Sequence, residues 1–276
     1  MTMLIAYDGS AFGAELLRSA RVVAEAARWP INVVAVEDED EELRVVDDDP
    51  ALEGLELHRV KGHVATAILD AAEHHEAHVI ALGLRSYHDG GFGHVAEELL
   101  HRATVVLFVM RPSSQPLRVL RRILVPMEGS PQTSAAMQVA DGALCAPGRE
   151  IIMLHVVSDS TPAESGSMPA PRFMDHAHYD WNDWEREFQM RFARCPHGGR
   201  HRVLAQAGDI GDVIVARTQE LEVDLVTITW KRRFEEGAAR IAHKVLDECP
   251  CPVLIVGQQS VAEALPEAAA SRLVVS

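Results

Sequence analysis

A glycine-rich segment of this 276-residue chain has the composition of a phosphate-binding loop. The segment Gly83–His94 joins an apolar run to a helix-like run and contains four glycines. Glycines let backbone N–H groups approach a phosphate closely, and the N-terminus of the following helix favours negative charge. The segment therefore predicts either a phosphate-binding loop or a loop that has lost that role.

The fourteen histidines of the chain raise the question of a metal site. The densest groups are His74–His78, His176–His178 and Cys195–His201. None has the paired Cys and His spacing of a structural zinc site. We therefore expect no metal, with histidines that are solvated or that cap helix ends. The alternative is the group near His176, where aspartates lie close in sequence.

Motifs that would indicate an enzyme are absent from the sequence. The chain has no Gly-x4-Gly-Lys-Ser/Thr phosphate loop, no Gly-x-Ser-x-Gly turn and no His-Glu-x-x-His zinc helix. Cys249 and Cys251 lie two residues apart, but we interpret them as part of a buried strand rather than as a redox pair. We expect no catalytic residues.

Charge and cysteine content limit the partners and the compartment. The formal net charge is −15, which disfavours binding to nucleic acid and to anionic membranes. No apolar run approaches the length of a membrane-spanning helix, and the N-terminus lacks the pattern of a signal peptide. Four cysteines are too few for a disulfide scaffold. We expect a cytoplasmic protein with reduced cysteines.

The sequence is an internal duplication. Met3–Ser10 recurs as Ile123–Ser130, and Ile31–Val36 recurs as Ile151–Val156, both at an offset of 120 residues. Beyond these segments the offset becomes 146 and stays there, so the second half carries about 26 extra residues between positions 157 and 207. Two constant offsets favour a tandem repeat over chance similarity.

Short apolar runs alternate with helix-like segments in each half, as is typical of a parallel sheet covered on both faces. We therefore predict an α/β fold with two tandem doubly wound parallel-sheet domains. The first spans residues 1–115, and the second spans residues 116–258 with an insert at about 157–207. Residues 259–276 form a tail, to which we assign no function.

The order of these pieces resembles the universal stress protein family, whose fold is of the adenine-nucleotide alpha-hydrolase type. The resemblance rests on a strand followed by Asp8, Gly and Ser, on the glycine loop, and on the helix that begins Val95-Ala-Glu-Glu. The segment Cys249–Val256 is similar to the last strand of that family. The resemblance covers residues 3–110 and 121–257, almost the whole chain.

Members of the family that bind ATP carry Gly-x2-Gly-x9-Gly-Ser/Thr after the fourth strand. In the first half Gly83 matches the first glycine, but Ser86 replaces the second, and Gly93 comes ten residues later instead of thirteen. His94 stands where Ser or Thr belongs. The resemblance implies that an adenine nucleotide would contact Ala6, Asp8, Ser10, Val36, Gly83, Arg85, Gly93, His94 and Val95.

The second half has lost this motif. Thr229, Arg232 and Ala239 occupy the three glycine positions, and Glu128 replaces the acidic residue of the first strand. We therefore expect any ATP or other adenine nucleotide to bind weakly and in the first domain only.

The resemblance implies a non-enzymatic binding protein that signals in a stress response. An alternative is a nucleotide-free adaptor that acts through dimerisation, and a further alternative is a slow ATPase. The two domains are expected to pair within the chain, and two chains to form a homodimer through their terminal strands, Val105–Met110 and Val253–Val256.

Two other segments are informative. The insert places Trp181, Trp184, Phe188 and Phe192 on one face of a helix. That face is expected to pack on the second domain or between the domains, and the alternative is a lid over the second domain's cleft. The acidic run made by Asp38–Glu42 and Asp47–Asp49 is expected to be a solvated loop, and the alternative is that it helps to bind a cation or a basic partner.

Overall fold

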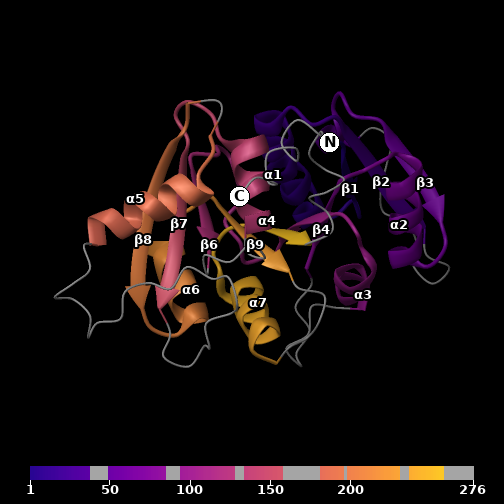
Figure 1. Ribbon diagram of the computed structural model, residues 1–276. Helices are drawn as coiled ribbons and strands as arrows, with labels where there is room; N and C mark the ends of the chain where they lie inside the picture. The colour runs from indigo at the N-terminus through magenta and orange to yellow at the C-terminus, as the bar shows by residue number, and fades with distance from the viewer. Residues whose placement is uncertain are drawn as a thin grey trace, which may run out of the picture. The chain divides into compact units, whose positions relative to one another are not determined.

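The structure, a computed structural model of the whole chain, describes residues 1–37, 49–84, 94–127, 134–157, 181–195, 198–230 and 236–257. These residues form two compact units, one beginning at Met1 and ending at Val119, the other beginning at Leu120. Each unit is described by itself below (Figure 1). Several segments named above lie outside the described residues: most of the acidic run, the His176 group and the C-terminal tail.

The first unit is a five-stranded parallel sheet with helices between the strands. Its sheet has the order β3-β2-β1-β4-β5. Its elements are β1 (Met3–Ala6), α1 (Ala11–Ala27), β2 (Ile31–Glu37), a 3-10 turn (Pro50–Leu52), β3 (Leu57–Lys61), α2 (Val64–His74), β4 (Val79–Gly83), α3 (His94–Arg102) and β5 (Val106–Met110). The strand order reverses beside β1, which is the doubly wound arrangement.

The second unit repeats this plan. Its sheet has the order β10-β9-β6-β7-β8. Its elements are β6 (Arg122–Pro126), α4 (Ser134–Val139), a π-helical turn (Ala140–Leu144), β7 (Glu150–Val157), α5 (Trp181–Phe192), β8 (Arg200–Ala207), α6 (Ile210–Glu220), β9 (Leu225–Trp230), α7 (Glu236–Glu248) and β10 (Val253–Gly257). The predicted α/β fold with parallel sheets is confirmed.

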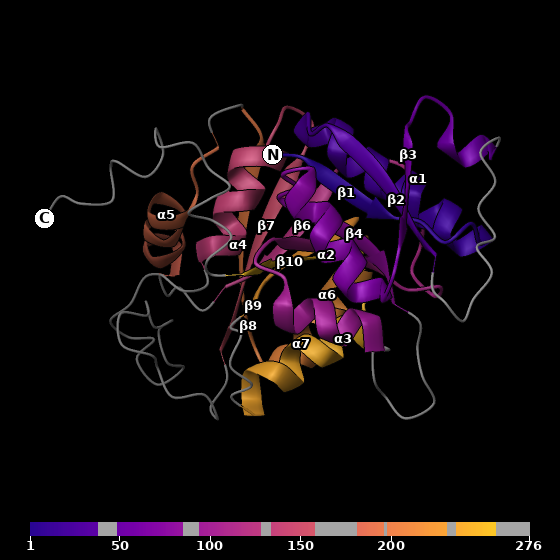
Figure 2. The same ribbon diagram turned by 90° about the vertical axis from the view of Figure 1, so that its right-hand side faces the viewer.

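Helices cover both faces of each sheet because right-handed crossovers place them there. In the first unit α1 follows β1 and leads toward β2, on one side of β1 in the sheet. Helices α2 and α3 lead in the opposite direction, from β3 to β4 and from β4 to β5, and they contact each other (Figure 2). In the second unit α6 and α7 form the corresponding contacting pair. The central strands are almost wholly buried and mostly apolar, whereas the edge strands β3 and β8 are partly exposed and carry polar residues.

Helix α1 shows how local sequence sets an element. Ser10 is its N-cap and accepts a hydrogen bond from the backbone N–H of Gly13 at 2.9 Å. The helix therefore begins at Ala11. Its apolar stripe is buried from Leu16 to Ala24. Arg28 ends the helix in the left-handed conformation, with φ of 59°.

The segment after β5 is held against the first unit. The buried hydroxyl of Ser19 on α1 accepts a hydrogen bond from the backbone N–H of Leu117 at 3.0 Å. Arg118 pairs with Glu15 of the same helix at 2.8 Å. The segment from Pro112 to Arg118, which contains the predicted domain boundary at residues 115–116, is therefore attached to α1 at its end.

Candidate functional site

The carboxyl ends of β1 and β4 lie side by side in the first unit. Ile5 of β1 is in register with Ala81 of β4, so Asp8 and Gly83, which come just after, belong to the same edge of the sheet. Asp8 is exposed, and its Oδ1 accepts hydrogen bonds from the backbone N–H and the hydroxyl of Ser10, at 3.0 and 2.7 Å. The structure thus places an exposed carboxylate at the N-terminus of α1.

Two glycines at this edge provide room for neighbouring side chains. A Cβ atom at Gly13 would lie 2.2 Å from Oδ1 of Asp8, so only glycine allows the carboxylate to take this position. A Cβ atom at Gly83 would lie 2.6 Å from the ring of Phe12. The sequence assigns Gly83 to phosphate binding, and the structure shows that its missing side chain also accommodates Phe12 on the first turn of α1.

Most of the other residues predicted to contact a nucleotide are among those that the structure describes. Ala6 and Val36 are half-buried near the ends of β1 and β2. His94 is exposed, and Val95 half-buried, at the start of α3. Arg85 and Gly93 lie outside the described residues. The structure therefore brings Asp8 into contact with Ser10 and sets Gly83 against α1.

Tyr7 and Asp49 form an interaction that the sequence did not predict. The hydroxyl of Tyr7, next to Asp8, donates a hydrogen bond to Asp49, whose carboxylate also caps the 3-10 turn. Burial raises the pKa of Tyr7, and the bond to Asp49 raises it further. The same bond lowers the pKa of Asp49. Asp49 ends an acidic run expected to be solvated, so no pattern in the sequence indicated this contact.

The corresponding edge of the second unit is built differently. Thr229 stands where the first unit has Gly83, and its hydroxyl accepts a hydrogen bond from the backbone N–H of Ala136 at 3.1 Å. His155 stands where the first unit has Ala35. Its Nδ1 lies 2.9 Å from the carbonyl oxygen of Met127, the counterpart of Tyr7. The carbonyl only accepts, so Nδ1 of His155 is the donor.

Helix α5 of the insert covers this part of the second unit. Trp184 and Phe188 are fully buried, and their ring centroids lie 5.3 and 5.7 Å from that of His155. Figure 1 shows α5 crossing β7 and β8, and α5 contacts β8. The predicted packing of the aromatic face on the second domain is confirmed. The carboxyl end of β7 is therefore covered by protein side chains, whereas Asp8 in the first unit is exposed.

Burial of His155 makes the second unit sensitive to acid. Burial lowers the pKa of His155, and the hydrogen bond to Met127 opposes this in part. The unfolded chain, with a pKa of about 6.5 for this group, then binds the proton more readily than the folded one. Stability is fully present above that value and is lost as the pH falls toward the folded pKa.

We expect His155→Gln to reduce this pH dependence. Between pH 6.5 and pH 5 the wild-type free energy of unfolding should fall by up to about 1.4 kcal/mol per pH unit more than that of the variant. Hydrogen exchange of β6 and β7 amides over this range measures the difference. His94→Gln, at an exposed histidine of the first unit, is the control. Equal slopes for the wild type and His155→Gln would contradict the assignment.

The cysteines correct one expectation. Cys145 and Cys195 form a disulfide, so the prediction that all four cysteines are reduced is wrong for this pair. The sequence offered no signal, because the two residues are 50 positions apart, one before the insert and the other within it. Cys249 and Cys251 are free and buried, as expected for the end of a core strand. Burial raises the pKa of the Cys251 thiol.

Among the described residues, no helix is both long and apolar enough to span a membrane.

His74 and His75 lie at the end of α2, as predicted for capping histidines, and the centroid of the His75 ring lies 4.4 Å from that of His58. Burial lowers the pKa of His75.

Comparison with known proteins identifies the family. The model of the universal stress protein family matches residues 120–257, half of this 276-residue chain. The chain belongs to that family. A search of curated protein sequences found no match to this universal stress protein.

Solved structures show the same fold over nearly the whole length of this universal stress protein. A universal stress protein from Archaeoglobus fulgidus is 17% identical, with 93% of this chain and 98% of that chain covered and a TM-score of 0.65. A functionally unknown protein from Pseudomonas aeruginosa is 12% identical, with 98% and 97% covered and a TM-score of 0.67. At these identities the likeness shows the fold alone.

A further solved structure holds a ligand. It is a universal stress protein family protein from Arabidopsis thaliana with AMP bound, 15% identical, with 54% of this chain and 99% of that chain covered and a TM-score of 0.34.

Proposed function

We propose that this universal stress protein is a non-enzymatic ligand-binding protein of the stress response and that its first unit alone binds an adenine nucleotide. The observation that carries the proposal is the difference between the two sheet edges. Asp8 is exposed at the first, whereas His155 at the second lies under Trp184 and Phe188 of the insert. Ligands of open parallel sheets bind at the carboxyl ends of the strands.

The proposed nucleotide lies across the ends of β1, β2 and β4. Its base and ribose contact Ala6, Asp8 and Val36, with the carboxylate of Asp8 accepting hydrogen bonds from the ribose hydroxyls. Its phosphates lie toward Gly83 and the N-terminus of α3, where His94 and Val95 begin the helix. Ser10, Arg85 and Gly93 complete the proposed set.

Phe12 supports weak rather than tight binding. The ring of Phe12 already lies against Gly83, so a phosphate near this glycine shares the space with an aromatic side chain. We propose no catalytic group, because the carboxylate of Asp8 is already engaged by Ser10 and serves to orient a ligand. We also propose that the protein acts in the cytoplasm.

Calorimetric titration with ATP, ADP and AMP, with and without Mg²⁺, tests the proposal. We expect one site per chain, and Asp8→Asn should weaken binding at least about tenfold, because hydrogen bonds to a charged group contribute about 1.5–3 kcal/mol. The matched control is Glu128→Gln, the same change at the counterpart of Asp8, which should leave the affinity unchanged.

Three results would contradict the proposal. These are no heat at millimolar nucleotide, a stoichiometry of two, and an equal loss of affinity in Asp8→Asn and Glu128→Gln. Hydrolysis of ATP by the wild type, absent in Asp8→Asn, would contradict the non-enzymatic part.

A further inference from the structure

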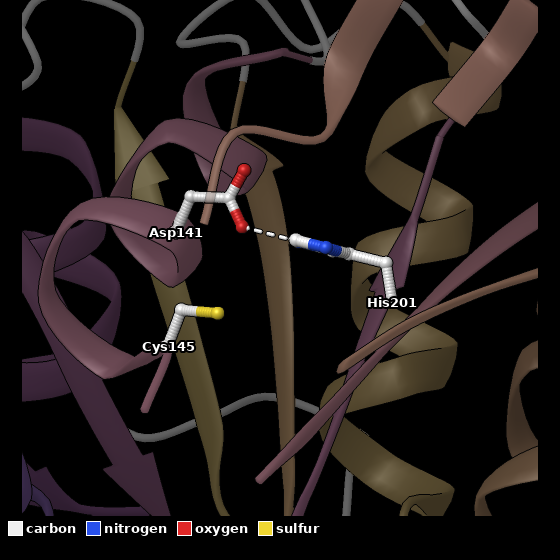
Figure 3. A group of neighbouring side chains, drawn as sticks. All are labelled: Asp141, Cys145 and His201. Atoms are coloured by element: carbon white, nitrogen blue, oxygen red, sulfur yellow. Dashed lines mark hydrogen bonds and ion pairs between the residues drawn. The ribbon is translucent and has the colours of Figure 1, made fainter. Parts of the chain in front are cut away.

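The second unit buries three side chains of types that ligate metal ions. Their possible ligand atoms, on Asp141, Cys145 and His201, all lie within 4.8 Å of one another. Figure 3 shows the Asp141 carboxylate meeting the His201 ring, with the Cys145 sulfur directed toward the same space. Cys145 is bonded to Cys195, which adds a second sulfur. We call these four residues the Cys145 cluster.

The cluster is assembled by three elements. Asp141 lies in the π-helical turn that ends α4, and Cys145 directly follows that turn. Such turns are rare and occur often at functional sites. His201 is the second residue of β8, and Cys195 follows α5. The helix after β6 therefore supplies Asp141 and Cys145, β8 supplies His201, and the segment after α5 supplies Cys195.

Asp141 is a buried carboxylate held by two donors. It is only 4% exposed. Its Oδ1 lies 2.6 Å from Nε2 of His201, and its Oδ2 accepts a hydrogen bond from the backbone N–H of Arg194, also at 2.6 Å. Arg194 immediately precedes Cys195, so the carboxylate fixes both the imidazole and the chain that carries the second sulfur.

The backbone of Gly199 lies close to both sulfur atoms of the cluster. The backbone N–H of Gly199 donates to Sγ of Cys195 at 3.1 Å. A Cβ atom at Gly199 would lie 2.5 Å from Sγ of Cys145, so the close approach of this backbone requires glycine. Backbone N–H groups that donate to sulfur are a recurring means of tuning thiolate ligands of metals.

We propose that the reduced protein binds one Zn²⁺ through the Cys145 cluster and that the disulfide is the oxidised, metal-free form of the same site. Two thiolates, an imidazole and a carboxylate are all ligands that Zn²⁺ accepts in tetrahedral sites. Zinc bonds of about 2.0–2.3 Å place tetrahedral ligand atoms roughly 3.3–3.8 Å apart. The ligand atoms of Asp141, Cys145 and His201 lie within 4.8 Å of one another, so they must approach by up to about 1.5 Å, and the two sulfur atoms separate when their bond is reduced.

The two forms interconvert by a balanced two-electron reaction. A dithiol reductant gives two electrons and two protons to the Cys145–Cys195 bond and becomes a disulfide itself. The two thiols then bind Zn²⁺ and release two protons. In the reverse direction one hydrogen peroxide and two protons oxidise the two bound thiolates to the disulfide, which releases Zn²⁺ and two waters.

Sulfur ligands distinguish this site from one for Mg²⁺ or Ca²⁺, which bind oxygen ligands. The proposal also explains how a disulfide can form in a protein that the sequence predicts to be cytoplasmic. Disulfides in reducing compartments are usually transient or redox-sensing, and paired cysteines there often bind metal.

Cobalt binding to the full-length protein provides the first test, because Co²⁺ in a tetrahedral thiolate site gives an intense visible and charge-transfer spectrum. The protein is reduced with a phosphine, which does not compete for the metal as a thiol would. We expect one Co²⁺ per chain in the reduced protein, displaced by one Zn²⁺, and none in the oxidised protein. Equal binding by the oxidised and reduced proteins, or no thiolate band, would overturn the proposal.

Variants assign the ligands. Cys145→Ser and Cys195→Ser should each lower Zn²⁺ affinity at least about 100-fold, since loss of a partner outside the ligand set alone costs 10–100-fold. The matched control is Cys249→Ala with Cys251→Ala, which removes the other two cysteines and should retain the cobalt spectrum. Retention of that spectrum by Cys145→Ser would overturn the proposal.

Alkylation of the wild type avoids variants that fail to fold. Zn²⁺ should slow the reaction of iodoacetamide with Cys145 and Cys195 in the reduced protein, and peptide mapping identifies the modified residues. Equal labelling of these two cysteines with and without Zn²⁺ would overturn the proposal.

Discussion

Reduction of the disulfide in metal-free protein should lower the free energy of unfolding of the second unit by about 4 kcal/mol. The bond closes a loop of 50 residues, and the chain-entropy relation for a loop of that length gives about this value at 25 °C. The loop contains most of the insert, whose freedom in the unfolded chain the bond restricts. The loss should therefore be large compared with the 5–15 kcal/mol typical of a whole domain.

Chemical denaturation with a chelator present, with and without the phosphine reductant, measures this effect. Hydrogen exchange of β7 and β8 reports on the second unit, and β1 and β4 provide the comparison within the same molecule. The double variant Cys145→Ser with Cys195→Ser should be destabilised to a similar extent and should no longer respond to the reductant. A wild type whose β7 and β8 amides exchange at the same rate in both conditions would contradict the prediction.

Trp184→Ala should destabilise the second unit by about 3–5 kcal/mol, the usual cost of truncating a large buried aromatic side chain. Trp184 is fully buried, and its ring packs at 4.9 Å from that of Phe188 as well as against His155. The truncation leaves a cavity beneath α5 and admits water to His155, so the shift of the His155 pKa should also diminish.

Met190→Ala is the matched control for this prediction. It lies on the same helix but is 70% exposed, so its truncation removes little buried area. Thermal unfolding together with hydrogen exchange of β7 and β8 distinguishes the two variants. If Met190→Ala and Trp184→Ala had equal effects, α5 would not be anchored through its aromatic face.

Much of the fold could be predicted from sequence because its signals are local. Val79–Leu82 is apolar at every position, and Leu225–Ile228 at every position but Thr227, which is typical of strands buried on both faces. The helix after β6 has a less regular apolar stripe in the sequence than α1 has. The structure supplies the reason, since the π-helical turn Ala140–Leu144 interrupts the α-helical period.

The candidate sites were predictable to differing degrees. Asp8 and Gly83 follow strands that pair in the sheet, so their positions at one edge could be inferred from the repeat. The role of Gly83 as a space for Phe12 could not, because it depends on the packing of α1. Asp49 and Tyr7 are 42 positions apart, and the pattern around Asp49 indicates only a charged loop.

The Cys145 cluster shows why the spacing of residues along the sequence did not reveal these possible metal ligands. The sequence grouped Cys195 with His197 and His201 because they are close along the chain. The structure instead joins Cys195 and His201 to Cys145 and Asp141, which lie 50 and 60 residues away from them respectively. No regular interval connects residues on a helix end, an insert and a strand, so three-dimensional proximity was required.

The bond between Cys145 and Cys195 also changes the connectivity of the molecule. The second unit is no longer a linear polymer but a covalent ring, containing β7 and α5, with a tail at each end. A single backbone cut within the ring opens it without releasing a fragment, whereas a cut in either tail separates the chain into two pieces. With zinc in place of the bond the ring remains closed through the metal, so only the reduced, metal-free chain is open.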